Sequence, residues 1–595
     1  MVMAAPRPPG AGLPRTVRSL WPVALITVLA GALRLVELGG VVGNTFYDAA
    51  VRSMSLSWHN FFFGAFDPGA ILAVDKPPLA LWLQVACVKV LGFNSYALKL
   101  PETLGGTLAV PLLYDAVRRA VGTAAGLAAA ATLAVLPISV LTARSDTMDS
   151  LTMMLTVAAL WCAVRAAGLG SRRWLVLMGV AFGLAFNVKL LQAFLALPAV
   201  VLLYGLAAPV AKRRRALDLA VAGLALVVVS LSWAVAVSLA PGRHPFPVGS
   251  TDGTVWNAMF VFNGLGRATG SVGLGFVVPP GPVRLLGGGA GHLGELLGSA
   301  LVAAVALAAA AAPALVRKGR VSTLSGAFTT AVMLWGAVGV VLFSVIGVLK
   351  VRYLDAVAPA LAATVGCGIG ALIGSGGGVA MPRAVDLLRL AAALACCCGY
   401  AFAIADAAVA WSTTIAAVGA IVVFATARGA SRPAANARMV GGALALGCCL
   451  VFPLHQSLAI VGSRQSDAGG LLTLPARVQR DLWRYLGPRT IAARYELAVD
   501  EPFGLAPLII HDGRPILPLT SYGTPIVTLG ALQQAVRSGA VRYALLYTCK
   551  ARPLIACGAT PTWVRQNGLD TSAAARLPNW LRLYRLGPPS RPSAR

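Results

Sequence analysis

Long apolar stretches recur along most of this chain and leave few ways for it to fold. Clear examples are residues 22–38, 99–117, 123–141 and 216–240. An α-helix needs about 17–25 apolar residues to cross the hydrocarbon core of a bilayer, and these stretches have that length. They do not alternate polar and apolar residues, as the strands of a membrane barrel would. The sequence therefore predicts an α-helical polytopic membrane protein.

The distribution of charge supports this class and argues against a nucleic-acid partner. Only 12% of the residues are charged and 58% are hydrophobic, which leaves too little polar surface for a soluble protein of 595 residues. The net charge of +28 would suit nucleic acid, but the basic residues lie in short clusters between the apolar stretches. These clusters are Arg118-Arg119, Arg172-Arg173, Lys212 to Arg215, Arg317 to Arg320, and Arg428 to Arg438. Basic loops stay on the cytoplasmic side, so we interpret them as topology signals.

The basic clusters predict about 13 transmembrane helices after a cytoplasmic basic tail at residues 1–19. The stretch at 78–92 is short and begins with two prolines, so we expect it to lie along the outer surface. The predicted transmembrane domain spans 20–461, with external loops at 40–98, which holds amphipathic helices, and at 241–295. The predicted helices are 20–39, 99–117, 123–141, 149–166, 174–188, 190–209, 216–240, 296–316, 325–348, 354–374, 385–408, 411–427 and 439–460.

Residues 462–595 differ in character and predict a small external α/β domain. The segments 507–510 and 541–547 resemble strands, and 529–538 resembles a helix that ends at Gly539. Cys549 and Cys557 lie in this polar region, where an oxidising exterior would allow a disulfide between them. Two free thiols are the alternative. The other cysteines lie in apolar segments, and no pair has metal-ligand spacing, so we predict no metal site without excluding a divalent ion.

Charged side chains collect at the outer ends of the predicted helices. Such residues are costly at membrane depth and usually mark function. Lys189 has almost no polar residues near it in sequence, so it needs an anionic partner from elsewhere. Carboxylates mixed with Lys and Arg could hold a phosphate and supply a general base. The candidates are Asp48, Asp67, Asp75, Lys76, Arg144, Asp146, Asp149, Lys189, Gln192, Arg267, Lys350, Arg352 and Tyr353.

Several short motifs occur in an order that resembles a known enzyme family. They are Asn44 to Met54, Ser57 to Phe62, Phe66-Asp67-Pro68, Val74 to Leu79, the turns at 144–149 and 187–192, Asn263 to Arg267, Lys350 to Leu354, and Val541-Arg542-Tyr543. This ordered set resembles the bacterial branch of the protein O-mannosyltransferase family, which is similar to the lipid A aminoarabinose transferases. Together the motifs cover most of the chain.

The resemblance implies a GT-C fold with an active site on the outer face of the cell membrane. It implies a mannosyltransferase-like glycosyltransferase that moves a hexose or pentose from a polyprenyl-phosphate donor to an extracytoplasmic acceptor. The reaction would invert the anomeric centre and need no cofactor. Its partners would be membrane lipids, the lipid-linked donor and the acceptor. Lys76, Lys189, Arg144 and Arg352 would stabilise the phosphate leaving group. Asp146, Gln192, Arg267, Lys350 and Tyr353 would complete the substrate site.

One departure from the family bears on the catalytic base. Related branches carry an Asp-Glu pair just after the first helix, where this chain has Gly43 and Asn44. The base candidates are therefore Asp75, Asp48, Asp67 and Asp149. We favour Asp75 beside Lys76, with Asp149 orienting the substrate and Asp48 left open.

Two other functions fit parts of the pattern. A transporter or lipid flippase would use intramembrane Lys and Asp, but it predicts internal repeats, which the sequence does not clearly show. A non-catalytic, transferase-like protein of envelope assembly would explain the missing acidic pair.

Overall fold

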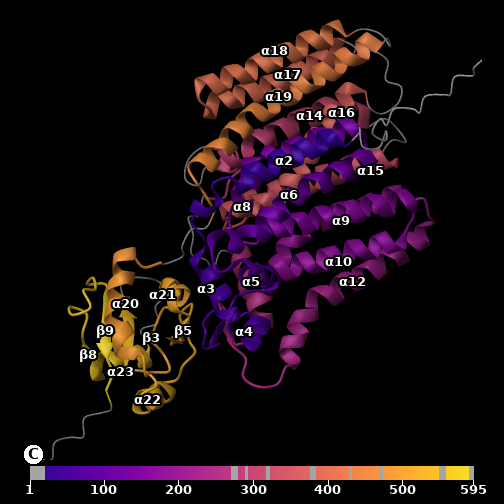
Figure 1. Ribbon diagram of the computed structural model, residues 1–595. Helices are drawn as coiled ribbons and strands as arrows, with labels where there is room; N and C mark the ends of the chain where they lie inside the picture. The colour runs from indigo at the N-terminus through magenta and orange to yellow at the C-terminus, as the bar shows by residue number, and fades with distance from the viewer. Residues whose placement is uncertain are drawn as a thin grey trace, which may run out of the picture.

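The computed structural model describes residues 20–269, 279–287, 293–315, 322–374, 384–427, 432–467, 473–548 and 558–587. A helical body holds most of the chain, and a small α/β unit that follows it lies at one end of the body, beside α3 (Figure 1). The long helices of the body are α2 (Trp21–Leu35), α6 (Ser95–Ala120), α7 (Thr123–Val135), α8 (Pro137–Ala143), α9 (Asp149–Leu169), α10 (Arg172–Lys189), α11 (Leu197–Ala207), α12 (Lys212–Leu239), α14 (Ser299–Leu315), α15 (Leu324–Val345), α16 (Ala358–Ile373), α17 (Ala384–Ile404), α18 (Ala407–Thr426) and α19 (Arg432–Gly462).

The body has the helices of a polytopic membrane protein. Within the described residues, eight helices are long and apolar enough to cross a bilayer, or nine if the bent pair α7–α8 is one span. The predicted helical membrane class is therefore confirmed. Each predicted transmembrane segment coincides with a helix or a pair of helices of the structure.

The predicted helix at 123–141 is two helices, because Pro137 interrupts it. Proline has no N–H to donate, and α7 and α8 meet there at an angle of 57°. The Arg34 guanidinium donates to the carbonyls that the break leaves free, at 3.0 Å from Ala134 O and 3.3 Å from Leu133 O. It also donates to Ser139 Oγ at 2.9 Å. This buried arginine therefore stabilises the break.

The chain between Arg172 and Ala207 turns back on itself, as the two predicted helices at 174–188 and 190–209 require. The turn is the 3₁₀ segment η2 (Leu190–Ala196), which begins at a residue with φ of 50°. The far ends of α10 and α11 then lie together. Arg172 Nε is 2.5 Å from Asp218 Oδ1, and Arg215 donates to Gly205 O at 2.6 Å.

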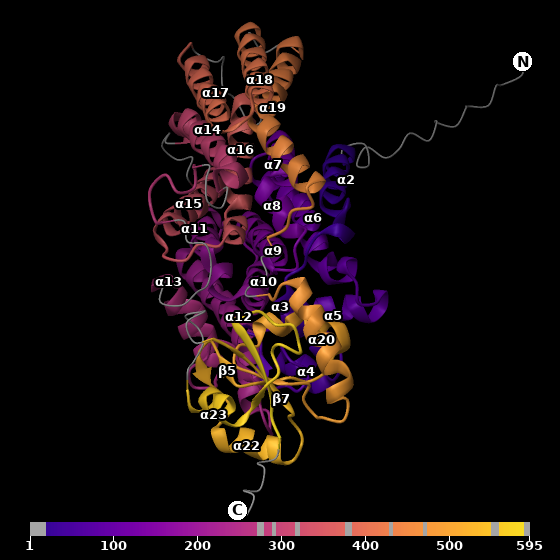
Figure 2. The same ribbon diagram turned by 90° about the vertical axis from the view of Figure 1, so that its left-hand side faces the viewer.

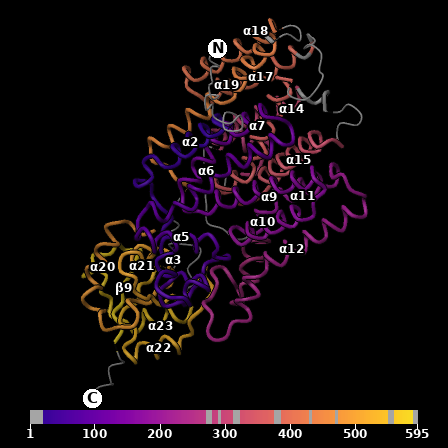
Figure 3. Tube along the Cα trace, turned by 45° about the vertical axis from the view of Figure 1, so that its right-hand side comes forward, coloured from indigo at the N-terminus to yellow at the C-terminus, as the bar shows by residue number. Residues whose placement is uncertain are grey.

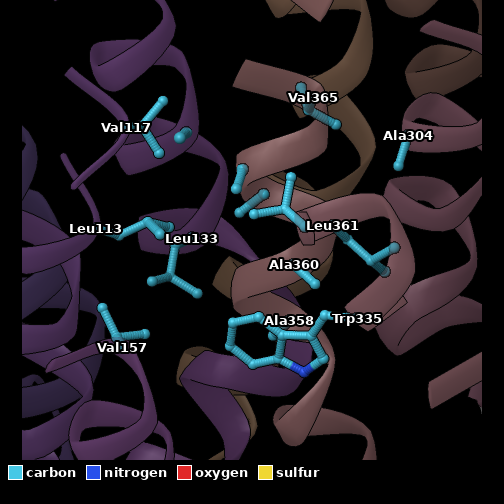
Figure 4. Close-up of a cluster of buried hydrophobic side chains, with 14 of the residues drawn as sticks. Leu113, Val117, Leu133, Val157, Ala304, Trp335, Ala358, Ala360, Leu361 and Val365 are labelled. Atoms are coloured by element: carbon cyan, nitrogen blue, oxygen red, sulfur yellow. The ribbon is translucent and has the colours of Figure 1, made fainter. Parts of the chain in front are cut away.

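Small residues allow the central helices of the body to approach closely. A Cβ on Gly366 of α16 would lie 2.5 Å from Ala125 O of α7, so only glycine fits there. Around this contact lies a cluster of buried side chains that includes Leu113, Leu133, Trp335 and Leu361 (Figure 4). The tight packing fixes the helix ends, where the polar residues lie.

The segment between α2 and α6 forms short elements at one end of the body. They are η1 (Leu38–Gly40), α3 (Thr45–Met54), α4 (Trp58–Phe63), β1 (Leu72–Ala73) and α5 (Leu79–Leu91). The helix α5 has 13 residues, about 20 Å, which is too short to cross the bilayer. Strand β1 pairs in parallel with β2 (Phe246–Pro247) of the second large loop. The two loops are therefore joined.

The α/β unit has a five-stranded sheet of order β4-β3-β7-β9-β8. Strand β7 pairs in parallel with β3 and antiparallel with β9. Helix α3 of the first loop packs against α21, and α3 and α5 lie near the unit in a second view (Figure 3). Its elements are α20 (Ala476–Thr490), β3 (Ala498–Val499), η6 (Phe503–Leu505), α21 (Ala506–Asp512), β4 (Leu517–Pro518), β5 (Thr520–Ser521), β6 (Thr524–Pro525), α22 (Leu529–Arg537), β7 (Tyr543–Tyr547), α23 (Ala559–Asn567), β8 (Leu569–Asp570) and β9 (Leu581–Arg585).

One of the three elements predicted in this unit is wrong. The helix at 529–538 and the strand at 541–547 are found as α22 and β7, but residues 507–510 belong to helix α21. Pro507 lies in the first turn of that helix, where proline is favoured, and Gly513 ends it with φ of 68°. A run of four apolar residues does not distinguish a buried helix from a strand. Cys549, Cys557 and residues 1–19 lie outside the described residues.

Candidate active site

Four residues from the two large loops form a polar network at the end of the body that faces the α/β unit. Lys76 Nζ lies 2.9 Å from Asp75 Oδ1 and donates to Tyr47 OH at 2.8 Å. Arg267 NH2 lies 3.3 Å from Asp75 Oδ2. Although burial acts to raise it, the charges of Lys76 and Arg267 hold the pKa of Asp75 below its ordinary value. Asp75 is therefore an anion that orients two cations.

A π-helix positions Arg267 in this network. Such helices are rare and often lie at functional sites, and η3 (Asn257–Gly266) is one of ten residues. Asn263 of this helix donates to Asp75 O at 2.6 Å and accepts from Arg267 Nε at 2.8 Å. The side-chain amide of Asn263 thus holds both the loop that carries Asp75 and the guanidinium of Arg267 in place.

A second network lies where α9 begins and α10 ends. Lys189 forms a close ion pair with Asp149, whose other oxygen is 3.9 Å from Arg352 Nε. Arg352 NH1 also lies 3.3 Å from Asp467 Oδ2, beyond the last helix of the body. The partner that the isolated Lys189 requires is therefore Asp149.

Tyr353 joins the two networks into one site. Its hydroxyl accepts from Arg267 NH1 at 3.3 Å, and Lys189 Nζ lies 5.0 Å from the centre of its ring. The 3₁₀ segment η5 (Val351–Ala356) presents Arg352 and Tyr353 to these neighbours. Sequence positions from 75 to 467 thus meet at one place.

Basic and acidic side chains are packed closely in this site. Lys76, Lys189, Arg267, Lys350 and Arg352 lie among the carboxylates of Asp75, Asp149 and Asp467, and around Asp75 two cations share one carboxylate. Burial and the nearby charges of Arg352, Arg267 and Lys76 lower the pKa of Lys350 well below its ordinary value. An anion bound here would relieve that repulsion.

Two carboxyl groups meet beside Gly43, at the position where related branches carry acidic residues. A side chain on Gly43 would begin 2.5 Å from Asp48 Oδ2 and 3.0 Å from Asp146 Oδ2. The Asp48 carboxyl, one helical turn along α3, therefore fills this space. Burial and the neighbouring Asp146 raise the pKa of Asp48 well above its ordinary value. Asn44 N donates to both oxygens of Asp146, at 3.0 and 2.8 Å.

This carboxyl pair lies next to the ion-pair networks. Asp467 N donates to Ser145 Oγ at 2.9 Å, and Thr147 Oγ1 donates to Asp467 Oδ2 at 3.2 Å. The residues on either side of Asp146 thus hold the carboxylate that pairs with Arg352. Asp146 is fully buried, whereas Asp48 is partly exposed.

Two predicted site residues, Arg144 and Asp67, lie apart from these groups, and Gln192 lies at their edge. Arg144 donates to carbonyls at the end of α2, at 2.6 Å from Val36 O and 3.2 Å from Leu33 O. Asp67 accepts from Ile71 N and Leu72 N at 3.0 and 2.7 Å, and burial raises its pKa to about 7. Gln192 lines a small cavity beside Asp149. Their positions favour structural roles for Arg144 and Asp67.

Asp467 and Tyr47 were not predicted as site residues. Asp467 follows the last helix and has no charged neighbour in sequence closer than Arg464. Tyr47 lies directly before Asp48, and its type and position in sequence do not distinguish it from a packing residue. Within the described ranges, no group of three or more His, Cys, Asp or Glu side chains is arranged to hold a metal ion.

Part of the chain that carries this site matches a known protein family. Residues 75–233 match the family model described as dolichyl-phosphate-mannose-protein mannosyltransferase. This segment is similar to that family over about a quarter of the chain. The resemblance predicted from the motifs is therefore confirmed, and the matched segment holds Asp75, Lys76, Asp146, Asp149 and Lys189.

Two curated relatives cover the same part of the chain. The Bacillus subtilis (strain 168) proteins named "Putative mannosyltransferase YycA" and "Putative mannosyltransferase YkcB" are 37% and 34% identical over 228 residues. The aligned part is 38% of this chain and 33% and 32% of those proteins. The match thus spans about one third of the length of these relatives.

Solved structures show a shared fold. The oligosaccharyltransferase AglB from Archaeoglobus fulgidus, in complex with an inhibitory peptide and a dolichol-phosphate, aligns with a TM-score of 0.52 at 13% identity. The alignment covers 94% of this chain and 73% of AglB. ArnT from Cupriavidus metallidurans bound to undecaprenyl phosphate aligns with a TM-score of 0.49 at 17% identity, over 96% and 97% of the two chains. The AglB alignment shows that this fold is shared over most of the chain.

Proposed function

We propose that this protein transfers a sugar from a polyprenyl-phosphate donor to an acceptor on the outer face of the cell membrane. The observation that carries the proposal is the buried pair of cations, Lys76 and Arg267, that share the single carboxylate of Asp75. The match to mannosyltransferases over residues 75–233 supports this substrate class, as does the dolichol-phosphate in AglB.

Lys76 and Arg267 would hold the phosphate that leaves the sugar. Negative charge grows on the phosphate oxygens as the glycosidic bond breaks, and preorganised cations stabilise that charge. Lys350 would add a third positive charge when the phosphate is present. Asp75 keeps the first two cations in place before the substrate arrives.

Asp48 is a better candidate for the catalytic base than Asp75. Asp75 is already neutralised by Lys76 and Arg267, so it accepts a proton poorly. Asp48 has a raised pKa and a carboxyl neighbour, Asp146, with which one proton can be shared. The ionised member would take the proton of the acceptor hydroxyl as that oxygen attacks the sugar carbon opposite the phosphate. A single displacement of this kind inverts the anomeric centre.

The proposed external position of the site requires that the chain cross the membrane thirteen times. Among the described residues, eight spans are long and apolar. Four further crossings are α6, the bent pair α7–α8, α14 and α16, and a fifth arises because α10 and α11 cross separately. The basic residues at the opposite ends of these helices support a cytoplasmic position for that end. Protease treatment of intact spheroplasts would then cleave the α/β unit and leave the 211–215 loop intact.

The proposed reaction can be tested on the full chain reconstituted in lipid vesicles. Undecaprenyl-phosphate mannose with a radiolabelled sugar is supplied together with membranes that contain the acceptor. We expect sugar transfer with release of undecaprenyl phosphate, reduced about a hundredfold or more in Asp48→Asn. The matched control is Asp115→Asn at the opposite end of α6. Intact donor and no transfer by the wild-type protein would contradict the proposal, and sugar movement across the vesicle without consumption would favour a flippase.

A further inference from the structure

A strained hairpin of the α/β unit reaches the active-site loops. Strands β5 and β6 pair antiparallel, with Ser521 opposite Thr524, so Tyr522 and Gly523 form a two-residue turn. Both turn residues have positive φ, 48° and 83°. Such turns favour Asn, Asp or Gly, because a bulky side chain is disfavoured in the left-handed region. A tyrosine at this position indicates that its side chain has a use that outweighs the backbone cost.

The ring of Tyr522 lies between the α/β unit and the wall of the active site. Its centre is 5.1 Å from the ring of Phe262 and 5.3 Å from that of Phe503. Phe262 belongs to the π-helix η3, and the guanidinium of Arg267 lies 5.2 Å from its ring centre. Ser521 Oγ accepts from Gly249 N of the second large loop at 3.3 Å. In Figure 2 the unit faces the viewer in front of the active-site end of the body.

The hydroxyl of Tyr522 is available to a ligand in this site. Burial, and then the negative charge of Asp75, raise the pKa of Tyr522, so the hydroxyl remains a hydrogen-bond donor at neutral pH. The charge of Arg267 also acts on it, which places it within electrostatic range of the site's cations. Among the described residues it has no hydrogen-bond partner, although its ring is firmly packed.

We propose that Tyr522 is a donor-binding residue that the α/β unit supplies to the active site, with its hydroxyl donating to an oxygen of the lipid-linked phosphate or of its sugar. The proposal rests on the proposed function and extends it, because the helical body alone would then hold an incomplete donor pocket.

The decisive variant is Tyr522→Phe, which keeps the ring contacts and removes only the hydroxyl. Tyr584→Phe is the matched control, because Tyr584 is a partly buried tyrosine on β9 of the same unit. Binding of undecaprenyl phosphate and turnover of undecaprenyl-phosphate mannose are measured on the full chain. We expect Tyr522→Phe to weaken phosphate binding, or to raise KM for the donor, by about tenfold to a hundredfold at an unchanged melting temperature.

The two readouts separate the possible contacts. Weaker binding of undecaprenyl phosphate places the hydroxyl on the phosphate, whereas a higher KM with unchanged binding places it on the sugar. Tyr522→Asn tests the turn, because asparagine tolerates the left-handed conformation. We expect this variant to lose donor affinity while the hairpin remains folded.

Equal behaviour of Tyr522→Phe and Tyr584→Phe in both assays would overturn this inference alone, provided that binding still depends on Lys76. If the wild-type protein neither binds undecaprenyl phosphate nor consumes the donor, the proposed function fails first and this inference falls with it.

Discussion

The two ends of the helical body carry the same types of residue in opposite arrangements. At the end of α6 and α9 away from the α/β unit, Asp115 accepts from Arg118, from Arg119 Nε at 2.5 Å and from Trp161 Nε1 at 2.8 Å. The arginines are 37% and 39% exposed, so water solvates the remaining charge. At the other end, Asp75, Lys76 and Arg267 are nearly buried, and the two cations share one carboxylate.

This contrast separates charges that set topology from charges that await a ligand. An exposed ion pair contributes little to stability and needs no further partner. A buried surplus of charge is unfavourable until a counter-ion neutralises it. The difference therefore assigns ligand binding to the end next to the α/β unit, and four experiments test that assignment.

The largest effect is expected from removing Lys76. The variant Lys76→Met keeps most of the side-chain volume and removes the charge that lies nearest to Asp75. We expect undecaprenyl-phosphate binding to fall by about a hundredfold or more, because a buried, charge-assisted contact is lost. Arg118→Met at the opposite end should bind as the wild type does. Similar losses in both variants would remove the distinction between the two ends.

A smaller effect is expected at the carboxyl pair. Replacing Asp146 by Asn removes the neighbour that helps to raise the pKa of Asp48, while an amide oxygen can still accept from Asn44 N. Because the base must be ionised, activity rises as pH increases through this pKa. We expect the acidic limb of the pH–rate profile to move to lower pH by roughly one unit. A limb that stays in place would exclude this pair as the base.

Lys350 should make phosphate binding depend on pH. Its pKa is lowered in the free protein, and a bound anion would favour the protonated form. Binding therefore takes up a proton, and affinity falls as pH rises above the pKa of the free protein. The loss approaches about tenfold per pH unit in that range. Calorimetry in buffers of different ionisation enthalpy measures the uptake, which Lys350→Met should abolish.

The smallest effect is expected from Arg119→Ala. The partly exposed pair with Asp115 contributes about 0.2–1 kcal/mol, so the melting temperature should change by a few degrees at most. Donor turnover should be unchanged. A large loss of activity would show that the end away from the α/β unit also takes part in function.

The sequence predicted the helices well because their signal is local. Each apolar stretch specifies its own helix, and the short α5 was separated from the spans by its length and prolines. The gathering of Asp75, Asp149 and Lys189 at one end also followed from counting the helices. Their contacts were beyond the sequence, because they depend on how distant helices pack.

The errors at individual site residues have the same cause, because those positions also depend on tertiary packing. Arg144 lies in a charged turn, yet its guanidinium binds carbonyls of α2, a direction that only tertiary structure decides. Asp48 fills the space beside Gly43 because α3 brings it one turn back toward that glycine. The sequence shows no acid at positions 43 and 44, whereas the structure places the Asp48 carboxyl beside Gly43.

The ion pair between Arg352 and Asp467 has a consequence for biosynthesis. Asp467 is made after every helix of the body, and Tyr522 emerges still later from the ribosome. A nascent chain that already contains Lys76 and Lys189 therefore still lacks part of the candidate site. The proposed function therefore predicts that the lipid donor does not react during synthesis and insertion, and that the protein becomes active only when residues 467–587 pack against the body.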